Sequence, residues 1–581
     1  MRKKLSTYIW EYKWQYLFAV ISLIISVSLD MLSPMLTLHI IDDVIMGGNL
    51  SLLPWLLGGI LTVGIGRCIF QYFKEYTFDK VGSKIASDMR IELFDHIQSL
   101  SCNYFDKTNT GELMARIKDD TDRIWDTLSY VGMLIIEVVF HTTVVLFCMY
   151  SLNAPLAVIP TLAMILCGFI AIKMENKLGE IYEAISEENA TLNTVAEENL
   201  AGVRTVKAFA REKFEIKKFL SHNKRYYELN MQQSKVFVKY YPCFQIITKL
   251  LPMVILLLGG RLVMKEVITL GALGAFIEYS NNIVWPMEML GWLSNSLSAG
   301  IASNKKINKI YEQKPAITVC EHPVILDKVE GKIEFSHVSF HKEDMHEILH
   351  DISFVVEPGK TIGIMGATGA GKTSVVQLLQ RLYDVTDGVI RLDGVDIREL
   401  NFEQLRGSIS IVMQDVFLFS DTITENVKLG KRDVVDLETV RQAAYAAQAS
   451  NFIEKMDDTY DTVIGERGVG LSGGQKQRIS IARALAKKAP ILVMDDSTSA
   501  LDMETEHEIQ KTLHSLEHTT KLIIAHRISA VRHADEIIIL ENGSIQERGT
   551  HEELLQKHGL YYATYVSQYG EPTMTTVKKE A

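Results

Sequence analysis

Residues 366–373 read Gly-Ala-Thr-Gly-Ala-Gly-Lys-Thr and lie between a short apolar run and a helix-like segment. The apolar run Thr361–Met365 predicts a buried strand, and Ser374 opens a stretch rich in Val, Gln and Leu that predicts a helix. Glycines in such a strand–loop–helix context let backbone N–H groups close around phosphate oxygens at a helix N-terminus, where the helix dipole favours anions. The pattern therefore predicts a phosphate-binding loop in an α/β domain.

The residue types of this loop predict its contacts. We expect Lys372 to reach the β- and γ-phosphates of a nucleotide, and the hydroxyl of Thr373 to be a ligand of Mg²⁺. A glycine-rich turn can match the pattern by chance, so the prediction depends on further elements. The predicted nucleotide-binding residues of the loop are Gly366, Ala367, Thr368, Gly369, Ala370, Gly371, Lys372, Thr373 and Ser374.

Further elements with matching chemistry follow in order along the chain. The apolar run Ile491–Met494 predicts a second buried strand, and Asp495 at its end is placed to hold Mg²⁺. Gln414 follows the predicted strand Ile409–Met413, and we expect it near the same metal ion and the attacking water. His526 follows another apolar run and has a side chain suited to contact a γ-phosphate.

A second predicted phosphate contact lies at residues 471–475, which read Leu-Ser-Gly-Gly-Gln and precede a basic segment that starts at Lys476. A helix that begins here would present backbone N–H groups without intrahelical partners at its N-terminus. The predicted binding residues of this segment are Ser472, Gly473, Gly474 and Gln475. The ordered set of elements is much more specific for a nucleotide site than the glycine-rich loop alone.

The N-terminal half of the chain has a different composition, with long apolar runs. A membrane span needs about 20 mostly apolar residues. Six stretches qualify: Tyr16–Ile41, Leu52–Tyr72, Leu128–Leu152, Leu156–Met174, Cys243–Val263 and Val267–Leu297. Because a soluble core of this size cannot house six such runs, we expect six membrane-spanning helices. The predicted fold class is therefore an all-α membrane domain with long cytoplasmic extensions, followed by an α/β nucleotide-binding domain.

Basic residues predict the orientation of the spans. The loop after the second span is rich in Lys and Arg from Lys74 to Lys118, and the loop after the fourth is rich from Lys177 to Lys239. The loops after the first and third spans have none, and Arg261 and Lys265 are a local exception. Both termini and both long loops are therefore expected in the cytoplasm. The net charge of −11, without a concentrated basic tract, argues against a nucleic-acid partner.

Charged residues inside membrane spans are costly and are therefore candidates for function. Glu137 and His141 are four residues apart on one helix face and could pair. An acidic lining of the transport path would favour a cationic or zwitterionic cargo, and Lys249 could instead neutralise one carboxylate. Structural pairing and substrate contact both stay open. The candidates are Asp30, Glu137, His141, Lys249, Glu278 and Glu288.

With these motifs the chain resembles, along essentially its whole length, an ATP-binding cassette half-transporter of the multidrug and lipid exporter type. The resemblance implies a transmembrane domain over residues 1–315, a linker at 316–330, a cassette at 331–570 and a disordered tail at 571–581. It also implies that loop tips near 105–117 and 198–210 are coupling helices that press on the cassettes. Ser499-Ala-Leu-Asp502 resembles the family's D-loop, and Thr462–Gly468 resembles its exporter-specific segment.

The resemblance further implies a mechanism and partners. ATP and Mg²⁺ bind between the glycine-rich loop of one cassette and the Leu471–Gln475 segment of another, so one chain with one cassette cannot complete a site. The expected partners are a second half-transporter chain, membrane lipid and a small amphiphilic substrate. ATP closes the cassettes and hydrolysis resets them, which alternates the access of the cargo site across the cytoplasmic membrane.

Two positions depart from the family pattern. Asp496 follows Asp495 where the family usually has the catalytic glutamate, and a carboxylate withdrawn by more than about 1 Å can cost roughly a hundredfold in rate. We therefore expect Asp496, His526 and Gln414 to form a weakly hydrolytic catalytic set. Asp496 has two interpretations: it is a tolerated replacement of one acid by another, or it marks the weak site of a heterodimer. We favour the heterodimer over a homodimer.

The second departure is the adenine-stacking position, where the family has an aromatic residue. Here the chain has His341-Lys342-Glu343, so His341 is the predicted, weaker adenine contact, or Lys342 lies over the ring. Loss of stacking weakens binding by about 1 kcal/mol or more. Rival functions are a homodimeric lipid or peptide exporter, an ATP-gated channel on the same scaffold, and a soluble ATPase, which the six apolar runs argue against.

Overall fold

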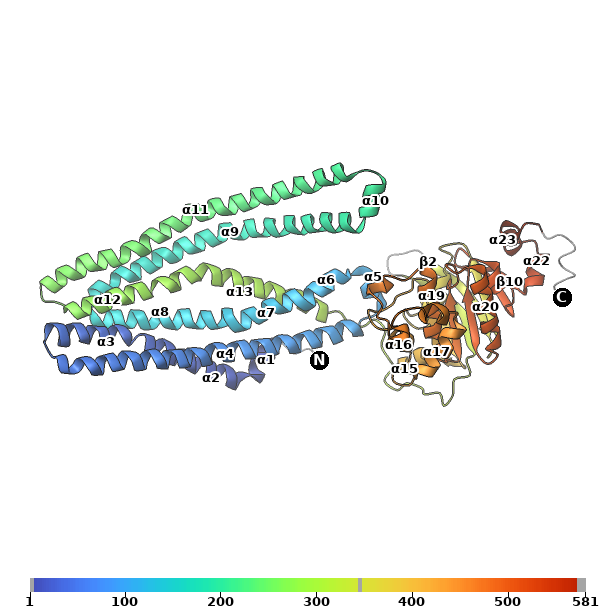
Figure 1. Cartoon of the computed structure of the whole chain (residues 1–581), viewed down its shortest axis with the longest axis horizontal. Coiled ribbons are helices and arrows are strands. Elements are labelled where there is room, and N and C mark those ends of the chain that lie inside the picture. Colours follow the sequence, from blue (N-terminus) through green and yellow to red (C-terminus); the bar gives the residue numbers. More distant parts are fainter. Residues whose placement is uncertain (1–4, 343–346, 572–581) are drawn as a thin grey trace. The chain divides into compact units, whose positions relative to one another are not determined.

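The computed structural model describes residues 5–342 and 347–571, so Glu343 and residues 572–581 of the predicted tail lie outside the described residues. The chain divides into two compact units (Figure 1). Unit 1 comprises residues 1–100 and 108–314, and unit 2 comprises residues 101–107 and 315–581. The short segment 101–107 therefore belongs to unit 2, although it is covalently continuous with unit 1 on both sides.

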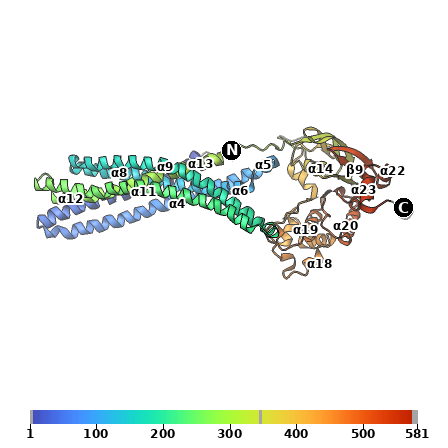
Figure 2. The same ribbon diagram turned by 90° about the horizontal axis from the view of Figure 1, so that it is seen from above.

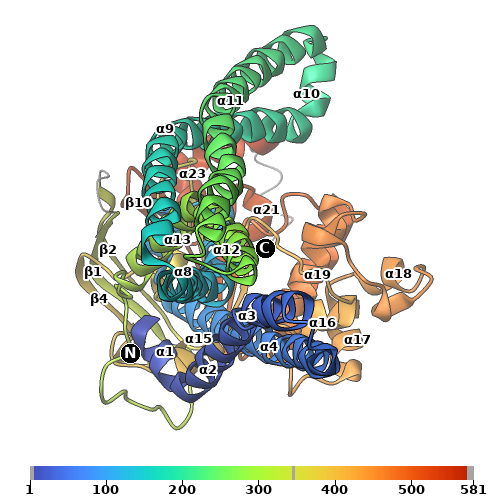
Figure 3. The ribbon, with the colours of Figure 1, turned by 90° about the vertical axis from the view of Figure 1, so that its left-hand side faces the viewer.

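The secondary structure of the described residues of unit 1 is helical. Its helices are α1 (Leu5–Glu11), α2 (Lys13–Asp30), α3 (Ser33–His39), α4 (Leu53–Ser99), α6 (Thr110–Ala115), α7 (Thr121–Asp126), α8 (Gly132–Leu152), α9 (Ala154–Ala201), α10 (Val203–Ala208), α11 (Glu212–Met264), α12 (Leu270–Asn282) and α13 (Val284–Tyr311), with π-helical segments η1 (Ile40–Met46), η3 (Arg116–Asp120) and η4 (Thr127–Val131) and the 3-10 turn η2 (Leu50–Leu52). The long helices α9 and α11 lie side by side and are joined by α10 (Figure 2). Seen along the helices, α12 lies between α3 and α11 (Figure 3).

Five helical stretches among the described residues are long and apolar enough to cross a membrane. They are Lys13–Met46, Leu50–Ser99, Thr110–Leu152, Ala154–Ala201 and Glu212–Met264. The sixth predicted span, Val267–Leu297, is instead divided at Ile283 into α12 and α13. The 13-residue α12 is too short to span alone, and α13 contains Glu288 and several serines that lower its hydropathy.

Three of the six predicted intramembrane candidates, Asp30, Glu137 and His141, contact a basic side chain or a backbone carbonyl. Lys74 Nζ donates to Glu137 Oε2 at 2.9 Å, and Arg67 forms an ion pair with Asp30. His141 Nε2 donates to the backbone carbonyl of Asn282 at 3.2 Å, so Glu137 and His141 have different partners rather than each other. Lys74 is 2% exposed, which explains why an acid must lie beside it. For Asp30 and Glu137 the structure favours structural pairing.

Unit 2 is an α/β domain with two sheets. Its elements are α5 (Cys102–Lys107), β1 (Ile333–His341), β2 (Glu347–Val356), β3 (Thr361–Gly366), α14 (Lys372–Leu379), β4 (Asp387–Leu392), β5 (Val395–Asp396), α15 (Phe402–Gly407), β6 (Ile409–Val412), α16 (Ile423–Lys428), α17 (Leu437–Ala446), α18 (Ser450–Ile453), η5 (Thr459–Asp461), η6 (Glu466–Gly468), α19 (Gly473–Ala486), β7 (Ile491–Asp495), α20 (Met503–Ser515), β8 (Thr520–Ile524), α21 (Ile528–Val531), β9 (Glu536–Glu541), β10 (Ser544–Gly549), α22 (His551–Gln556) and α23 (Leu560–Tyr569).

The order of strands places the candidate site. The larger sheet has the order β10-β9-β3-β8-β7-β6, in which only β10 is antiparallel to its neighbour. The smaller antiparallel sheet has the order β2-β1-β4-β5. The apolar runs that predict buried strands are buried on both faces, as parallel strands require. An all-α domain with membrane-length helices, followed by an α/β domain, confirms the predicted fold class.

Candidate nucleotide-binding site

Four neighbouring parallel strands end at the same edge of the larger sheet. The glycine-rich loop follows β3, His526 follows β8, Asp495 ends β7, and Gln414 follows β6. Because β3, β8, β7 and β6 are consecutive neighbours, the four predicted motifs lie next to one another along this edge. The carboxyl edge of a parallel sheet is the usual ligand site of such folds.

The glycine-rich loop needs glycine at two positions for steric reasons. Gly366 has φ +152°, and a Cβ on it would collide with the carbonyl oxygen of Leu540 on neighbouring β9. Gly371 has φ +95°, and a Cβ there would meet the side chain of Leu349 and the carbonyl of Ile348. The left-handed Gly371 is also the N-cap of α14, so it turns the chain directly into that helix.

Lys372 is folded back against the loop. Its Nζ donates to the carbonyl oxygens of Gly366 and Ala367, each at 2.8 Å, and its side chain is buried. Burial lowers the pKa of Lys372, and the carboxylates of Asp495 and Asp496 act in the opposite direction. An ammonium group held here at the start of α14 presents positive charge where the helix N-terminus also favours anions.

The two carboxylates at the end of β7 differ in environment. Asp495 is 4% exposed, and burial raises its pKa, aided by the charge of Asp496 and opposed by a hydrogen bond from Thr373. Asp496 adopts φ +43°, and its backbone N–H donates to the carbonyl of Ile524 at 2.9 Å. The left-handed turn ends the strand at once and separates the directions of the two side chains.

One cavity of about 280 Å³ unites these groups. Its lining contains ten of the predicted site residues: Thr368, Gly369, Gly371, Lys372, Thr373, Ser374, Gln414, Asp495, Asp496 and His526. The other three predicted loop residues, Gly366, Ala367 and Ala370, are not among the described lining residues. Two further lining residues, Ile348 and Ile524, are apolar strand residues that the sequence does not distinguish from core.

Two other predicted contacts lie outside this cavity. Ser472 caps α19: its hydroxyl accepts from the backbone N–H of Gln475, whose side chain accepts from the backbone N–H of Ser472. This capping box leaves Ser472 and Gly473 exposed at the helix N-terminus. His341 ends β1, where its Nδ1 lies 3.2 Å from the Thr386 hydroxyl.

Lys342, the alternative predicted adenine contact, has other partners in the structure. Its Nζ donates to Asp106 Oδ2 of α5 at 2.8 Å and lies 4.6 Å from the centre of the Tyr383 ring. The Tyr383 hydroxyl donates to the same carboxylate oxygen at 2.8 Å. Asp106 therefore joins α5 to the part of unit 2 next to the predicted adenine position.

Contacts from two helices, α20 and α23, stabilise the loop after β8, and the sequence did not predict them. Gln568 of α23 donates to the carbonyl of His526 at 2.8 Å and accepts from the N–H of Ile528 at 3.0 Å. Arg527 pairs with buried Glu506 of α20 at 3.2 Å and also donates to the carbonyl of Ser499. Contacts between residues 40 positions apart leave no local signal in a single sequence.

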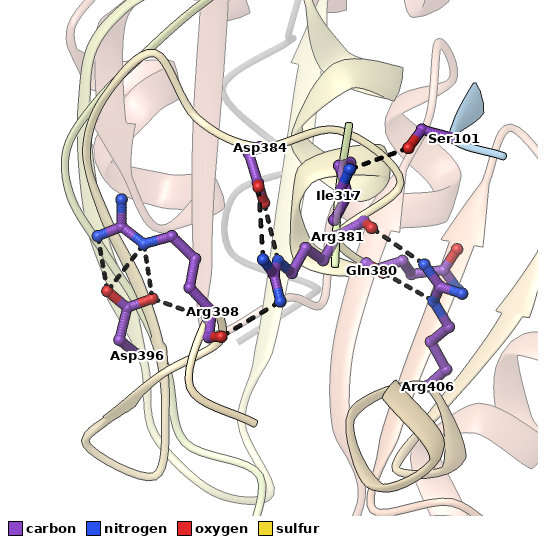
Figure 4. A network of polar contacts seen from close by, with 8 residues as sticks. All are labelled: Ser101, Ile317, Gln380, Arg381, Asp384, Asp396, Arg398 and Arg406. Atoms are coloured by element: carbon purple, nitrogen blue, oxygen red, sulfur yellow. Dashed lines mark hydrogen bonds and ion pairs between the residues drawn. The ribbon is translucent and has the colours of Figure 1, made fainter. Parts of the chain in front are cut away.

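The C-terminal end of α14 is also fixed. The Arg406 guanidinium of α15 donates to the carbonyls of Gln380 and Arg381 at 3.2 and 3.1 Å, where a helix end lacks partners (Figure 4). Arg381 in turn pairs with Asp384 at 2.8 Å and donates to the carbonyl of Arg398. These contacts hold the helix that carries Lys372 against the segment leading into β6.

Comparisons with known proteins agree with this geometry. Residues 16–287 match the ABC transporter transmembrane region, and residues 349–499 match the ABC transporter family. The Bacillus subtilis ABC transporter ATP-binding protein YknU is 36% identical over 98% of both chains. The ATP-dependent lipid A-core flippase of Syntrophus aciditrophicus is 34% identical over 91% of this chain and 88% of its own.

The chain is also similar in three dimensions to a solved structure. A bacterial Atm1-family ABC exporter, solved with ATP bound, matches 97% of this chain and 99% of its own with a TM-score of 0.82 and 27% identity. The expected function as an ATPase coupled to transport is confirmed by these relatives. The chain belongs to the ABC transporter family, as a multi-pass membrane exporter whose helical membrane domain is fused to one ATP-binding domain.

Proposed function

We propose that this chain uses ATP to export a small amphiphilic molecule across the cytoplasmic membrane by alternating access, as one half of a dimer. The observation that carries the proposal is the convergence of the glycine-rich loop, Gln414, Asp495 and His526 on one cavity. This cavity belongs to a chain whose other unit has five membrane-length helices. The basic loops support a cytoplasmic location for both termini and the ATP-binding unit.

The residues around the cavity suit a nucleotide with Mg²⁺. Lys372 and the start of α14 supply positive charge for phosphates, and the Thr373 hydroxyl and Asp495 are oxygen groups of the kind Mg²⁺ prefers. Both residues line the same cavity, which supports their joint role as ligands of one ion. A bound Mg²⁺ ion would neutralise phosphate charge, while Gln414 orients water and His526 contacts the γ-phosphate.

The dimer follows from the position of Ser472–Gln475. This capped helix N-terminus is exposed and lies outside the chain's own cavity, so it is available to the nucleotide of another cassette. Asp496 lines the cavity with a carboxylate one methylene shorter than glutamate. We therefore favour a heterodimer in which this chain carries the weakly hydrolytic site and its partner the stronger one.

Two relatives bear on the cargo. One is a lipid A-core flippase, and another, YgaD of Bacillus subtilis, is 34% identical over 97% of this chain and is named for multidrug export. The first name gives a lipid as cargo and the second gives drugs, which is why we propose a drug- or lipid-like substrate. A homodimeric lipid exporter is the second candidate, supported by the flippase relative.

Transport in inside-out membrane vesicles tests the proposal. Vesicles from cells that express the chain with its partner should accumulate either rhodamine 6G or a fluorescent phospholipid when ATP and Mg²⁺ are added. Lys372→Ala in the chain should lower the initial rate, and chelation of Mg²⁺ should abolish it. Flux that follows the concentration gradient without net accumulation would favour a channel and contradict the proposal.

A further inference from the structure

A cavity of about 240 Å³ lies within unit 1, between α9, α11 and α13. Its walls come from Ile170 to Tyr182 on α9, from Phe237 to Phe244 on α11 and from Met287 to Asn295 on α13. On α9 and α11 these residues lie at the ends of the apolar stretches that the charge distribution predicts to face the cytoplasm. The cavity is therefore separate from the nucleotide site and lies where a cargo molecule would enter.

The lining combines aromatic rings with acids. Phe237, Tyr241, Phe244 and Trp292 contribute rings, while Glu175 and Glu288 contribute carboxylates from two different helices. None of the described residues that line the cavity is Lys, Arg or His. Aromatic faces attract cations at roughly 0.5–2 kcal/mol per contact, and two carboxylates add attraction of the same sign.

These two acids differ from the intramembrane carboxylates of Asp30 and Glu137 in their partners. Asp30 pairs with Arg67, and Glu137 pairs with Lys74. Within the described part of the chain, no basic side chain forms an ion pair with Glu175 or Glu288. Among the described residues, the Glu288 carboxylate accepts a 3.3 Å hydrogen bond from Gln245. Glu175 Oε2 lies 3.6 Å from the place where a Cβ on Gly291 would stand, so it is next to α13. A positive charge from outside the chain would complete the site.

A neighbouring cavity is also aromatic and acidic, although its Glu75 carboxylate lies 3.9 Å from Lys74 Nζ and its Tyr76 ring has Lys80 Nζ at 5.6 Å. It has a volume of about 490 Å³ and is lined by Tyr72, Tyr76, Tyr130, Glu75 and Asp79 among others, again without a basic residue among the described lining. The Tyr130 ring of this cavity lies 5.7 Å from the Trp292 ring of the first, in an edge-to-face contact. The acidic and aromatic character therefore continues across the Tyr130–Trp292 pair.

We propose that the cavity between α9, α11 and α13 binds aromatic organic cations, with Glu175 and Glu288 as the charge-recognising groups and Trp292 and Tyr241 as ring contacts. The inference names a cargo class and rests on the proposed export function for its biological meaning. Binding itself requires no nucleotide. An anionic lipid headgroup would meet two carboxylates here and is excluded from this cavity by charge.

Three probes of similar size and different charge test the site. Phenyltrimethylammonium, its neutral isostere tert-butylbenzene and the anion benzenesulfonate are titrated by calorimetry into the purified full chain in lipid nanodiscs, with empty nanodiscs subtracted. The cation should bind at least about tenfold more tightly than either of the other probes, a difference of roughly 1.4 kcal/mol. Equal affinity for the cation and its neutral isostere would overturn the proposal.

Matched variants assign the carboxylates. Glu175→Gln with Glu288→Gln keeps the shape and should reduce cation affinity about tenfold or more, with little effect on tert-butylbenzene. Glu180→Gln with Glu183→Gln removes the same two charges from exposed positions of α9 outside the cavity and should leave affinity unchanged. An equal loss in both sets of variants would mean a general surface-charge effect and refute the site.

Lys372→Ala separates this inference from the proposed function. The variant should show a lower initial rate of ATP-driven transport and still bind phenyltrimethylammonium with the affinity of the parent chain. Cation binding with glutamate dependence but without any ATP-driven transport would remove the export proposal and keep the site. If the chain transports cations and Glu175→Gln and Glu288→Gln do not change this transport, the export proposal stands and the proposed cation site is wrong.

Discussion

Asp496 is the residue at which a single methylene group has the largest expected consequence. Its carboxylate lines the nucleotide cavity beside Asp495, and its backbone holds a left-handed conformation at φ +43°. Asp496→Glu would extend the carboxylate by more than about 1 Å toward the position of an attacking water. We expect the variant to raise the ATPase rate of the protein several-fold, with KM for ATP little changed.

The measurement is steady-state ATPase activity of the purified transporter in nanodiscs. Asp496→Asn, which keeps size and removes the charge, serves as the control and should lower the rate or leave it low. Because non-glycine residues other than Asp and Asn are less favourable in the left-handed region, the glutamate variant should also melt slightly earlier. An unchanged rate with an intact fold would show that the residue at 496 does not limit hydrolysis.

Single residues also show how far the sequence predicts the site. Lys372, Gln414, Asp495 and His526 could be identified because each follows an apolar run, and parallel strands bring the ends of such runs to one edge. The partner of Lys342 could not be identified, because Asp106 is 236 residues away and the contact depends on how α5 packs. Side chains that contact across distant segments carry no local pattern.

At the scale of elements, α23 supports the loop that carries His526. Gln568 contributes both a donor and an acceptor, to the carbonyl of His526 and the N–H of Ile528. Each such hydrogen bond contributes about 1 kcal/mol, and their loss would let the loop move away from the γ-phosphate. We expect Gln568→Ala to lower kcat several-fold with a smaller change in KM for ATP.

Two further variants separate positioning from general instability. Gln568→Glu keeps the acceptor for Ile528 and loses the donor for His526, so it should reduce kcat as well, while Gln556→Ala on exposed α22 should not. Thermal unfolding, followed alongside activity, should be similar in the two Gln568 variants. If kcat falls only in proportion to the folded fraction, Gln568 has no positioning role.

The helix α5 is the element that belongs to unit 2 and is nevertheless continuous with α4 and α6 of unit 1. Asp106 attaches it through Lys342 and Tyr383. Burial opposes ionisation of Asp106, but the two hydrogen bonds outweigh burial and hold its pKa below the ordinary value. The attachment is therefore fully present above the ordinary pKa of an aspartate, about 4, and is lost as pH falls further.

Asp106→Asn should weaken this attachment at neutral pH. Because Asp106 lies outside the nucleotide cavity, we expect basal ATPase activity to persist while its stimulation by cargo falls at least about twofold, in line with the modest energy of a partly exposed ion pair. Asp119→Asn removes an exposed acid of unit 1 and is the matched control. If cargo stimulates the ATPase activity of the parent and of Asp106→Asn equally, α5 is not the element that couples cargo binding to ATP hydrolysis.

At the scale of the whole molecule, the sequence predicts the class of each unit well and their subdivision less well. Apolar runs predict membrane helices because length and composition alone determine whether a helix can span. The division of the sixth run at Ile283 into α12 and α13 depends on packing against α3, α8 and α11, which composition does not encode. A single chain likewise gives no direct sign of its partner.

The whole-molecule prediction concerns the division of labour in a dimer. If this chain supplies the weak site, the chain purified alone should hydrolyse ATP slowly, and co-expression with a half-transporter that has glutamate after its Mg²⁺-binding aspartate should raise the rate by about tenfold or more. Within that pair, Ser472→Ala in this chain should be more damaging than Asp496→Asn. Ser472 would serve the partner's nucleotide, whereas Asp496 would serve the slower site.

The asymmetry of the two variants distinguishes the assemblies. In a homodimer both sites need Asp496 and Ser472 alike, so the two substitutions should be similarly harmful. Ser472→Ala also removes a helix cap worth about 1 kcal/mol, so Ser472→Thr, which retains a capping hydroxyl, is tested in parallel to separate loss of folding from loss of phosphate contact. Brisk turnover by the lone chain, with Asp496→Asn as damaging as Ser472→Ala, would establish the homodimer and exclude the heterodimer.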